Sequence, residues 1–342
     1  MISTVFKEKD LATYGEWMQN YNKFVILTHL SPDGDALGSS LAMMQYLRNK
    51  GKEAWVIVPN AFPAFFRWMP RIRDVVQYDF HKERGNALID MADAIICMDF
   101  NVPKRMHEIG AKVAETGKPL MLIDHHPNPD SCFTLSFSKP KMCATCEVLF
   151  RLWGELGEEE LIDRDIAICL YTGLMTDTGA FTYNSSRPEV FEIVSRLLTR
   201  GIDKDAIYRR VFHSNSVGRM QLMGYTLCEK MKIYPQERAA LITLTQEELK
   251  RYGYVKGDTE GFVNLPLQIR DVVFSCFLRE DKTMIKVSLR SVGEFSCTEF
   301  AAEVFDGGGH HNASGGECHD DMTTAIARFE AGLEKYRTKL IK

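Results

Sequence analysis

Residues 24–40 have the sequence FVILTHLSPDGDALGSS, which joins a short apolar run to a polar turn and then to a helical pattern. The apolar run has the length and composition of a buried strand. Leu37, Leu41, Met44 and Leu47 then recur at helical spacing. A strand followed by a crossover helix is the beginning of a βαβ unit, so this stretch predicts a parallel sheet.

Three further apolar runs of strand length follow in the first half of the chain: AWVIV (54–58), AIICMD (94–99) and LMLID (120–124). Helical patterns come next, at 144–156, 163–175 and 188–200. Strands that alternate with helices are typical of α/β proteins with helices on the faces of the sheet. We therefore expect an α/β fold whose N-terminal domain is a mainly parallel sheet flanked by helices.

The length of 342 residues favours two domains, because single cores rarely grow beyond about 250–300 residues. Residues 202–230 have a more polar helical pattern without a flexible Gly-, Ser- or Pro-rich tract, which predicts a helical connector. Later segments indicate a second, smaller mixed α/β domain: β patterns at 232–245, 271–280 and 283–291, and a helix at 323–338. We expect a catalytic domain at 1–201, a connector at 202–230 and a substrate-binding domain at 231–342.

Composition limits the expected partners. The net charge of −4 argues against duplex DNA, which needs many Lys and Arg contacts to phosphates, but allows a small anionic substrate. No apolar run reaches the roughly 18 residues of a membrane span. The nine cysteines lack the even spacing of a secreted disulfide framework. We expect a cytoplasmic protein without membrane contacts, and the sequence leaves its oligomeric state open.

The turn after the first expected strand carries His29, Asp33 and Asp35. Pro32 and Gly34 favour a tight turn that brings the imidazole and both carboxylates together, and clustered carboxylates are costly without a cation. Asp and Gly are also common in Asx-type turns that cap a following helix. This motif alone supports metal binding and helix capping about equally.

Other strand ends supply the same kinds of side chain. Asp99 ends one apolar run, and Asp124, His125 and His126 follow one another at the end of another. Open parallel sheets bind ligands outside the carboxyl ends of their strands, so we expect these side chains at one edge. Asp177 stands near two glycines that would allow close approach to that edge, although alone it also fits a simple turn. The combination favours a metal site.

Cys143 and Cys146 form a C-x-x-C pair, which is found in zinc sites and redox sites. No second C-x-x-C accompanies the pair in the sequence. We therefore expect structural thiols at the start of a helix.

Taken together, the motifs resemble the DHH phosphoesterase superfamily, named for the triplet that is present here as Asp124-His125-His126. The four motifs lie in the family's order over about residues 24–185. The stretch FDGGGHHNASGG at 305–316 is similar to the family's DHH-associated C-terminal domain, so the resemblance covers nearly the whole chain. Length and this ending resemble the nanoRNase group, which removes mononucleotides from very short RNAs and dephosphorylates 3′-phosphoadenosine 5′-phosphate.

The resemblance implies a centre with two metal ions per chain. His29 and Asp33 would hold the first ion, Asp35, His125 and Asp177 would hold the second, and Asp99 would bridge both. His126 would lie beside the substrate phosphate, either as a residue that supports the metal ligands or as a proton donor, and Asp124 would orient the histidines. His126, Asp99 and Asp124 complete the implied catalytic set. The family implies Mn²⁺, which mixed imidazole and carboxylate ligands suit without excluding Fe, Co or Zn.

In the smaller domain, the expected substrate-binding residues are Arg290, Gly307, Gly308, Gly309 and His310. The glycines would give the backbone the freedom to form an anion-binding concavity beside the Arg290 guanidinium. The same residues would also fit an ordinary Gly-rich turn and a surface Arg that do not bind substrate. Asp306 stands where the family usually has Gly or another small residue, a departure that affects the expected shape of the loop.

We expect a two-metal hydrolase of short single-stranded RNA or a small phosphorylated nucleotide, acting without a covalent intermediate. Pyrophosphatase and processive single-strand DNA exonuclease fit less well, because the first has a different C-terminal signature and the second needs a more basic path. A cyclic-dinucleotide phosphodiesterase stays open as an alternative. A non-catalytic nucleotide sensor is disfavoured, because such a protein should have lost metal ligands and all six positions are filled here.

Overall fold

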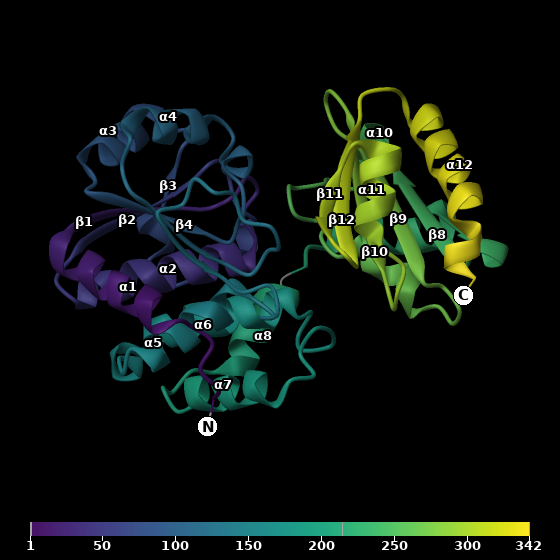
Figure 1. The fold of residues 1–342 in the computed structure, drawn as a ribbon. Helices are drawn as coiled ribbons and strands as arrows, with labels where there is room; N and C mark the ends of the chain where they lie inside the picture. The colour runs from purple at the N-terminus through teal and green to yellow at the C-terminus, as the bar shows by residue number, and fades with distance from the viewer. Residues whose placement is uncertain (1, 214, 342) are drawn as a thin grey trace. The chain divides into compact units, whose positions relative to one another are not determined.

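The computed structural model describes residues 2–213 and 215–341. The chain divides into two compact units, Met1–Ser214 and Asn215–Lys342, each with its own sheet (Figure 1). The boundary between the units falls inside the segment 202–230, between α8 (Lys204–Phe212) and α9 (Val217–Tyr225).

The first unit is built on a six-stranded sheet of order β3-β2-β1-β4-β5-β6. Every neighbouring pair in it is parallel. The strands are β1 (Lys23–Leu27), β2 (Glu53–Val58), β3 (Val76–Gln77), β4 (Ala94–Met98), β5 (Leu120–Asp124) and β6 (Leu135–Ser138). Because β1, β4 and β5 are adjacent and parallel, the residues after these three strands lie side by side at one edge.

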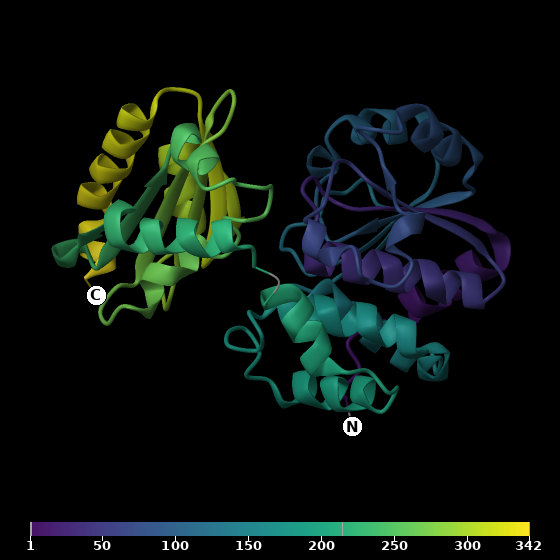
Figure 2. The same cartoon turned by 180° about the vertical axis from the view of Figure 1, so that it is seen from behind.

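Helices cover both faces of this sheet (Figures 1 and 2). One face packs on α3 (Lys82–Met91) and α4 (Glu108–Thr116), whose apolar side chains meet Val25 and Leu27 of β1. The alternate residues Phe24 and Ile26 face a larger core. That core is completed by α1 (Glu8–Asn20), α2 (Gly34–Asn49), α5 (Thr145–Glu155), α6 (Arg164–Asp177), α7 (Pro188–Leu198) and α8.

Two of these helices approach each other unusually closely, because glycines face each other where α2 crosses α6. A Cβ atom on Gly38 would lie 2.5 Å from the carbonyl oxygen of Cys169, and one on Gly173 would lie 2.6 Å from Oδ1 of Asp35. Such distances are below any normal contact, so only glycine permits this packing. The crossing brings Asp35, in the first turn of α2, to Asp177 at the end of α6.

The second unit contains a mixed sheet of order β11-β12-β10-β9-β8-β7. Only the β8–β9 pair is parallel in the part of the sheet that is described. Its strands are β7 (Met231–Tyr234), β8 (Ala239–Leu244), β9 (Phe274–Glu280), β10 (Ile285–Ser291), β11 (Gly308–His310) and β12 (Ala313–Cys318). One face packs on α11 (Cys297–Phe305) and α12 (Met322–Leu340), and the other packs on α9 and α10 (Gln246–Arg251).

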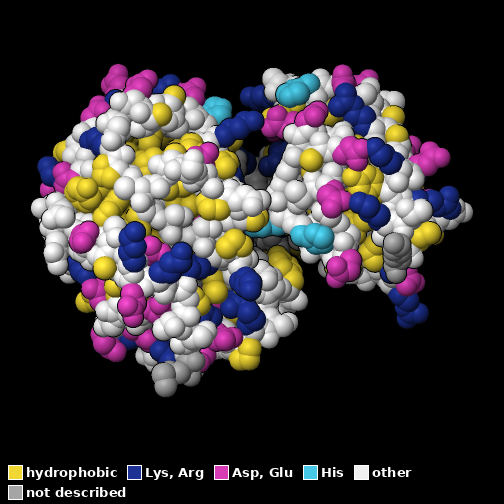
Figure 3. All heavy atoms as spheres, in the orientation of Figure 1, with side chains coloured by type: hydrophobic (Ala, Val, Ile, Leu, Met, Phe, Trp, Pro, Cys, Tyr) yellow, Lys and Arg dark blue, Asp and Glu magenta, His cyan; other side chains and the backbone are white. Residues whose placement is uncertain are grey.

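The shorter helical segments lie in the connections. They are Ala64–Phe66, Ile72–Asp74, Pro103–Met106 and Glu159–Leu161 in the first unit, and Thr226–Lys230, Pro235–Glu237 and Phe262–Gln268 in the second. None of the helices at residues 2–213 and 215–341 combines the length and apolar character of a membrane span. Figure 3 shows basic and acidic side chains interspersed on the visible face of each unit. The expected α/β fold, a parallel sheet flanked by helices followed by a domain with a mixed sheet, is confirmed.

Candidate metal centre

The segment between β1 and α2 carries the first group of polar side chains. His29 is 6% exposed, and its Nε2 lies 3.9 Å from Oδ2 of Asp33. Asp33 is the N-cap of α2, and its Oδ1 accepts hydrogen bonds from the backbone N–H groups of Asp35 and Ala36 at 3.0 Å. One carboxylate oxygen therefore caps the helix while the other faces the histidine, so the two interpretations of this motif do not exclude each other.

Asp99 follows β4 and lies at the centre of the group. Its Oδ2 is 3.5 Å from Nε2 of His29, and its Oδ1 is 3.6 Å from Nε2 of His125. The backbone of Asp99 is left-handed, with φ of 65°, a conformation that costs a residue with a side chain about 1–2 kcal/mol. Such strain concentrates at functional sites, where it aims a side chain in a required direction.

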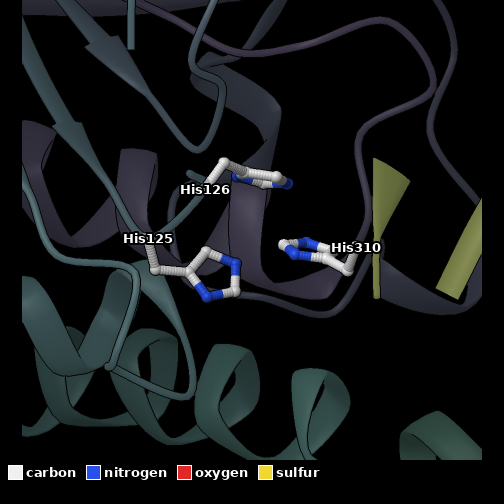
Figure 4. A group of neighbouring side chains, drawn as sticks. All are labelled: His125, His126 and His310. Atoms are coloured by element: carbon white, nitrogen blue, oxygen red, sulfur yellow. The ribbon is translucent and has the colours of Figure 1, made fainter. Parts of the chain in front are cut away.

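The end of β5 delivers three residues in succession. Asp124 is fully buried, and its Oδ1 lies 2.7 Å from Nδ1 of His126. His125 and His126 extend beyond the end of the strand (Figure 4), with His125 Nε2 3.3 Å from Oδ2 of Asp177 at the end of α6. The Nδ1 atom of His125 lies 3.3 Å from the carbonyl oxygen of Met142, which fixes the orientation of the ring.

The predicted ligands gather into two groups at this edge of the sheet. His29, Asp33 and Asp99 form one group and Asp35, His125 and Asp177 form the other, and within each group the potential ligand atoms lie within 4.8 Å of one another. Asp99, Asp124 and His126 meet the same distance criterion. All eight residues predicted for the first domain are therefore brought together.

The titration of the cluster reflects crowded carboxylates. Burial raises the pKa of Asp35 to about 7, and the charge of Asp99 adds to this effect. Burial acts against ionisation of Asp99, but the hydrogen bond with His29 and the neighbouring histidines outweigh it and hold its pKa well below the ordinary value. Burial also lowers the pKa of His125, but nearby carboxylates, led by Asp177, offset this and raise it to about 9. The crowded carboxylates of the cluster thus favour a positive charge among them, which a cation could supply.

The donor set fits a divalent metal ion that prefers oxygen and nitrogen. Imidazole nitrogens and carboxylate oxygens are the converging atoms, and burial keeps the pKa of the adjacent Cys146 thiol well above its ordinary value, so no thiolate competes. Oδ2 of Asp124 is a buried oxygen without a hydrogen-bond partner among the described residues. A buried polar oxygen is costly when unpaired, and a nearby cation would reduce that cost.

The predicted substrate-binding residues all lie in the second unit. Arg290 is on β10, on the same face as Lys286 and Ser288, and lines a small hollow with Arg279 of β9. Burial lowers the pKa of Lys286, and the positive charge of Arg279 lowers it further. Glu260 is the acidic residue in the lining.

Three of the four residues in the Gly-rich stretch 307–310 form a strand and not the expected loop. Residues Gly308–His310, the last of which is labelled in Figure 4, are β11 and pair with β12. A Cβ atom on Gly307 would lie 2.0 Å from the carbonyl oxygen of Gly315, so glycine is required for close strand approach. Asp306 is the C-cap of α11 with φ of 50°, a position that favours glycine and that Asp tolerates.

The first two residues of α5 also contact the cluster, and these contacts were not predicted. Thr145 donates its backbone N–H to Oδ2 of Asp35 at 2.6 Å and its hydroxyl to Oδ1 of Asp99 at 2.8 Å. The backbone N–H of Cys146 donates to Oδ1 of Asp35 at 3.0 Å. A threonine at the start of a predicted helix was the only signal in the sequence.

Comparison with known proteins places this arrangement in a family. A model of the DHH family N-terminal domain matches residues 23–174, and a model of the DHHA1 domain matches residues 241–336. The bifunctional oligoribonuclease and PAP phosphatase NrnA of Thermus thermophilus is 31% identical over 320 residues, which cover 93% of this chain and 90% of that protein.

Two solved structures are also similar. An exopolyphosphatase-related protein from Bacteroides fragilis is 48% identical, with a TM-score of 0.96 and full coverage of both chains. RecJ from Thermus thermophilus in complex with Mn²⁺ is 13% identical, with a TM-score of 0.56 over 99% of this chain and 56% of that one, and shares the fold alone. The chain therefore belongs to the DHH family, with a DHH N-terminal domain in its first unit and a DHHA1 domain in its second.

Proposed function

We propose that the protein is a divalent-metal phosphoesterase that hydrolyses very short RNA oligonucleotides and removes the 3′-phosphate of 3′-phosphoadenosine 5′-phosphate. The observation that carries this proposal is the pair of ligand groups on either side of Asp99. The similarity to a protein named as an oligoribonuclease and PAP phosphatase over nine-tenths of both chains supports the choice of substrate.

The proposed centre holds two Mn²⁺ ions. His29 and Asp33 are assigned to the first ion, and Asp35, His125 and Asp177 to the second. Asp99 is assigned to both, because its Oδ2 faces His29 and its Oδ1 faces His125. The oxygen and nitrogen donors suit Mn²⁺, and an Mn²⁺ complex is known for a RecJ protein with the same fold.

The metal ions would supply an acidified water and neutralise charge on the phosphoryl oxygens. The chain contributes orientation and a proton. Asp124 accepts the hydrogen bond from Nδ1 of His126, which sets the ring so that the other nitrogen points away from Asp124. We assign His126 to hold a proton for the leaving oxygen, and Asp99 and Asp124 to keep the histidines in place.

In the second unit, Arg290, Gly307, Gly308, Gly309 and His310 are assigned to the nucleotide part of the substrate. The row of Lys286, Ser288 and Arg290 on one face of β10 supports this assignment, because it offers charged donors to a phosphate. A Cβ atom on Gly308 would meet nothing within 4 Å, so the backbone is accessible there. The same proposal assigns metal binding and catalysis to residues 1–201 and substrate binding to residues 231–342, with residues 202–230 as a helical connector.

The test of the function is a panel of substrates supplied to metal-free protein with and without Mn²⁺. We expect release of mononucleotides from RNA dinucleotides and of phosphate from 3′-phosphoadenosine 5′-phosphate, with little action on longer RNA. Preferential hydrolysis of cyclic dinucleotides would instead favour the alternative phosphodiesterase. Binding without turnover would favour a nucleotide sensor.

The test of the second unit is Arg290→Ala. A charge-assisted hydrogen bond is worth about 1.5–3 kcal/mol, so kcat/KM for a dinucleotide should fall by about 10- to 100-fold. Hydrolysis of bis-p-nitrophenyl phosphate should fall far less, because that ester has no nucleotide to recognise. Arg270→Ala, at an exposed position outside the hollow, is the matched control. Equal losses on both substrates would contradict the assignment of Arg290.

A further inference from the structure

The start of α5 lies against the candidate ligands and is fully buried. Thr145 and Cys146 are the first two residues of the helix, and both are 0% exposed. The first N–H groups of a helix have no partner within the helix, so they are available to an anion. Here both donate to the carboxylate of Asp35, at 2.6 and 3.0 Å. The helix start thus holds Asp35 through its backbone.

The side chain of Thr145 makes a separate contact. Its hydroxyl donates to Oδ1 of Asp99 at 2.8 Å. The same oxygen faces His125, at 3.6 Å, and the other oxygen of Asp99 faces His29, at 3.5 Å. This hydrogen bond therefore fixes the rotation of the carboxylate that stands between the two ligand groups.

A buried ion cluster fixes the position of Thr145. Glu147 is fully buried and accepts hydrogen bonds from the backbone N–H of Cys143 at 2.8 Å and from Nε of Arg151 at 2.9 Å. Nη2 of Arg187 donates to Oε2 of Glu147, the oxygen that also accepts from Cys143, at 2.5 Å. Since these contacts hold the backbone on both sides of Thr145, they fix the position from which its side chain extends.

We propose that Thr145 is a positioning residue that sets the Asp99 carboxylate for metal binding. The inference rests on the proposed function, because it assigns Asp99 to both ions. A hydroxyl in so buried a place needs a hydrogen bond, and its acceptor is the carboxylate of Asp99 at 2.8 Å. A threonine serving only the helix would instead bond to the backbone, as Thr226 does through the carbonyl oxygen of Leu222.

The experiment compares Thr145→Val, which keeps the shape and removes the hydroxyl, with Thr145→Ser, which keeps the hydroxyl. Calorimetric titration of the metal-free proteins with Mn²⁺ should show affinity about 10- to 100-fold weaker for the Val variant, the usual effect of losing a partner of a ligand. The Ser variant should bind within a few-fold of wild type. Thr226→Val, which removes an equally buried hydroxyl in the second unit, should leave affinity unchanged.

Thermal unfolding of the metal-free proteins shows whether each variant folds. If Thr145→Val does not fold, Thr145→Ala against Thr145→Ser isolates the hydroxyl. Wild-type Mn²⁺ affinity in a folded variant without the hydroxyl would overturn the inference and leave the proposed function standing. Failure of the wild-type protein to bind Mn²⁺ would overturn the proposed function, and the inference with it.

Discussion

Replacing Asp99 with Asn removes one negative charge from the cluster while it keeps the shape of the side chain. Asn also tolerates the left-handed backbone at this position, and its amide oxygen can still accept the hydrogen bond from Thr145. The charge of Asp99 repels the neighbouring carboxylates of Asp35 and Asp177 and attracts His29 and His125. These effects oppose each other, and we expect the stability of the metal-free protein to change by no more than about 1 kcal/mol.

The metal-dependent part of the stability should respond differently. A ligand at 100 times its Kd stabilises the folded protein by about 2.7 kcal/mol. Loss of a residue that only hydrogen-bonds a metal ligand can weaken metal binding by about 100-fold. If Asp99→Asn weakens one site by about this factor, the stabilisation by the ligand falls to about 0.4 kcal/mol. For a unit of this size each kcal/mol corresponds to about 2–4 °C, so the Mn²⁺-induced rise in Tm should shrink by about 5–9 °C for each site affected.

The assay is thermal unfolding of metal-stripped protein at increasing Mn²⁺, with turnover of 3′-phosphoadenosine 5′-phosphate measured in parallel. Asp79→Asn, an exposed position after β3, is the matched control and should behave as wild type. Asp99→Asn should unfold near the wild-type temperature without metal, gain little from Mn²⁺ and lose activity. A wild-type rise in Tm together with wild-type turnover would refute the assignment of Asp99 to both ions.

Three further outcomes are expected. His126→Ala should retain bound Mn²⁺ by elemental analysis but turn over slowly, and loss of one metal ion would mean that the roles of His125 and His126 are reversed. In the metal-free protein at pH 7, the raised pKa of about 9 keeps His125 protonated and the raised pKa of about 7 leaves Asp35 about half protonated. Since a ligand imidazole must be neutral and a ligand carboxylate ionised, Mn²⁺ binding should release more than one proton. Calorimetry in buffers of different ionisation enthalpy measures this release. Affinity should rise by at least about tenfold per pH unit from 6 to 8, more steeply below pH 7 where Asp35 is also protonated. Affinity independent of pH would contradict this prediction. Gly38→Ala should lower the free energy of unfolding by about 1–3 kcal/mol and weaken Mn²⁺ binding, because its Cβ would meet the Cys169 carbonyl oxygen. The control Gly154→Ala, whose Cβ would meet nothing within 4 Å, should stabilise α5 slightly, and thermal unfolding measures both effects.

The long apolar strands were predictable because burial dictates their composition. The residues of β4 are all buried and form a continuous apolar run, which the sequence displays directly. Two strands of the same sheet were missed. β3 has only two residues, Val76–Gln77, and β6 has four, in which buried Leu135 and Phe137 alternate with more exposed serines. Sequences this short cannot be distinguished from turns by their pattern, because it is the pairing with a neighbouring strand that makes them strands.

The grouping of His29, Asp99 and His125 could be predicted because parallel strand ends share one edge of a sheet. The contacts of Thr145 could not, since its partner Asp35 is 110 residues away in the sequence. They depend on where the start of α5 meets the first turn of α2, which is set by helix packing and by Gly173 at the crossing. For the Gly-rich stretch 307–310, the sequence predicted a loop where the structure has a strand. Glycine permits both a loop and close strand pairing, and only the pairing with β12 decides between them.

The order of the candidate ligands along the chain has a consequence for synthesis. His29 is made early and Asp177 is made near the end of the first unit, after the sheet and α5. Since α6 must pack against α2 to bring Asp177 beside His125, a nascent chain that stops short of α6 offers only an incomplete ligand set. Domains fold as units as they leave the ribosome, and partial sites bind metal weakly. Loading of the proposed metal centre would therefore follow translation of the whole first unit.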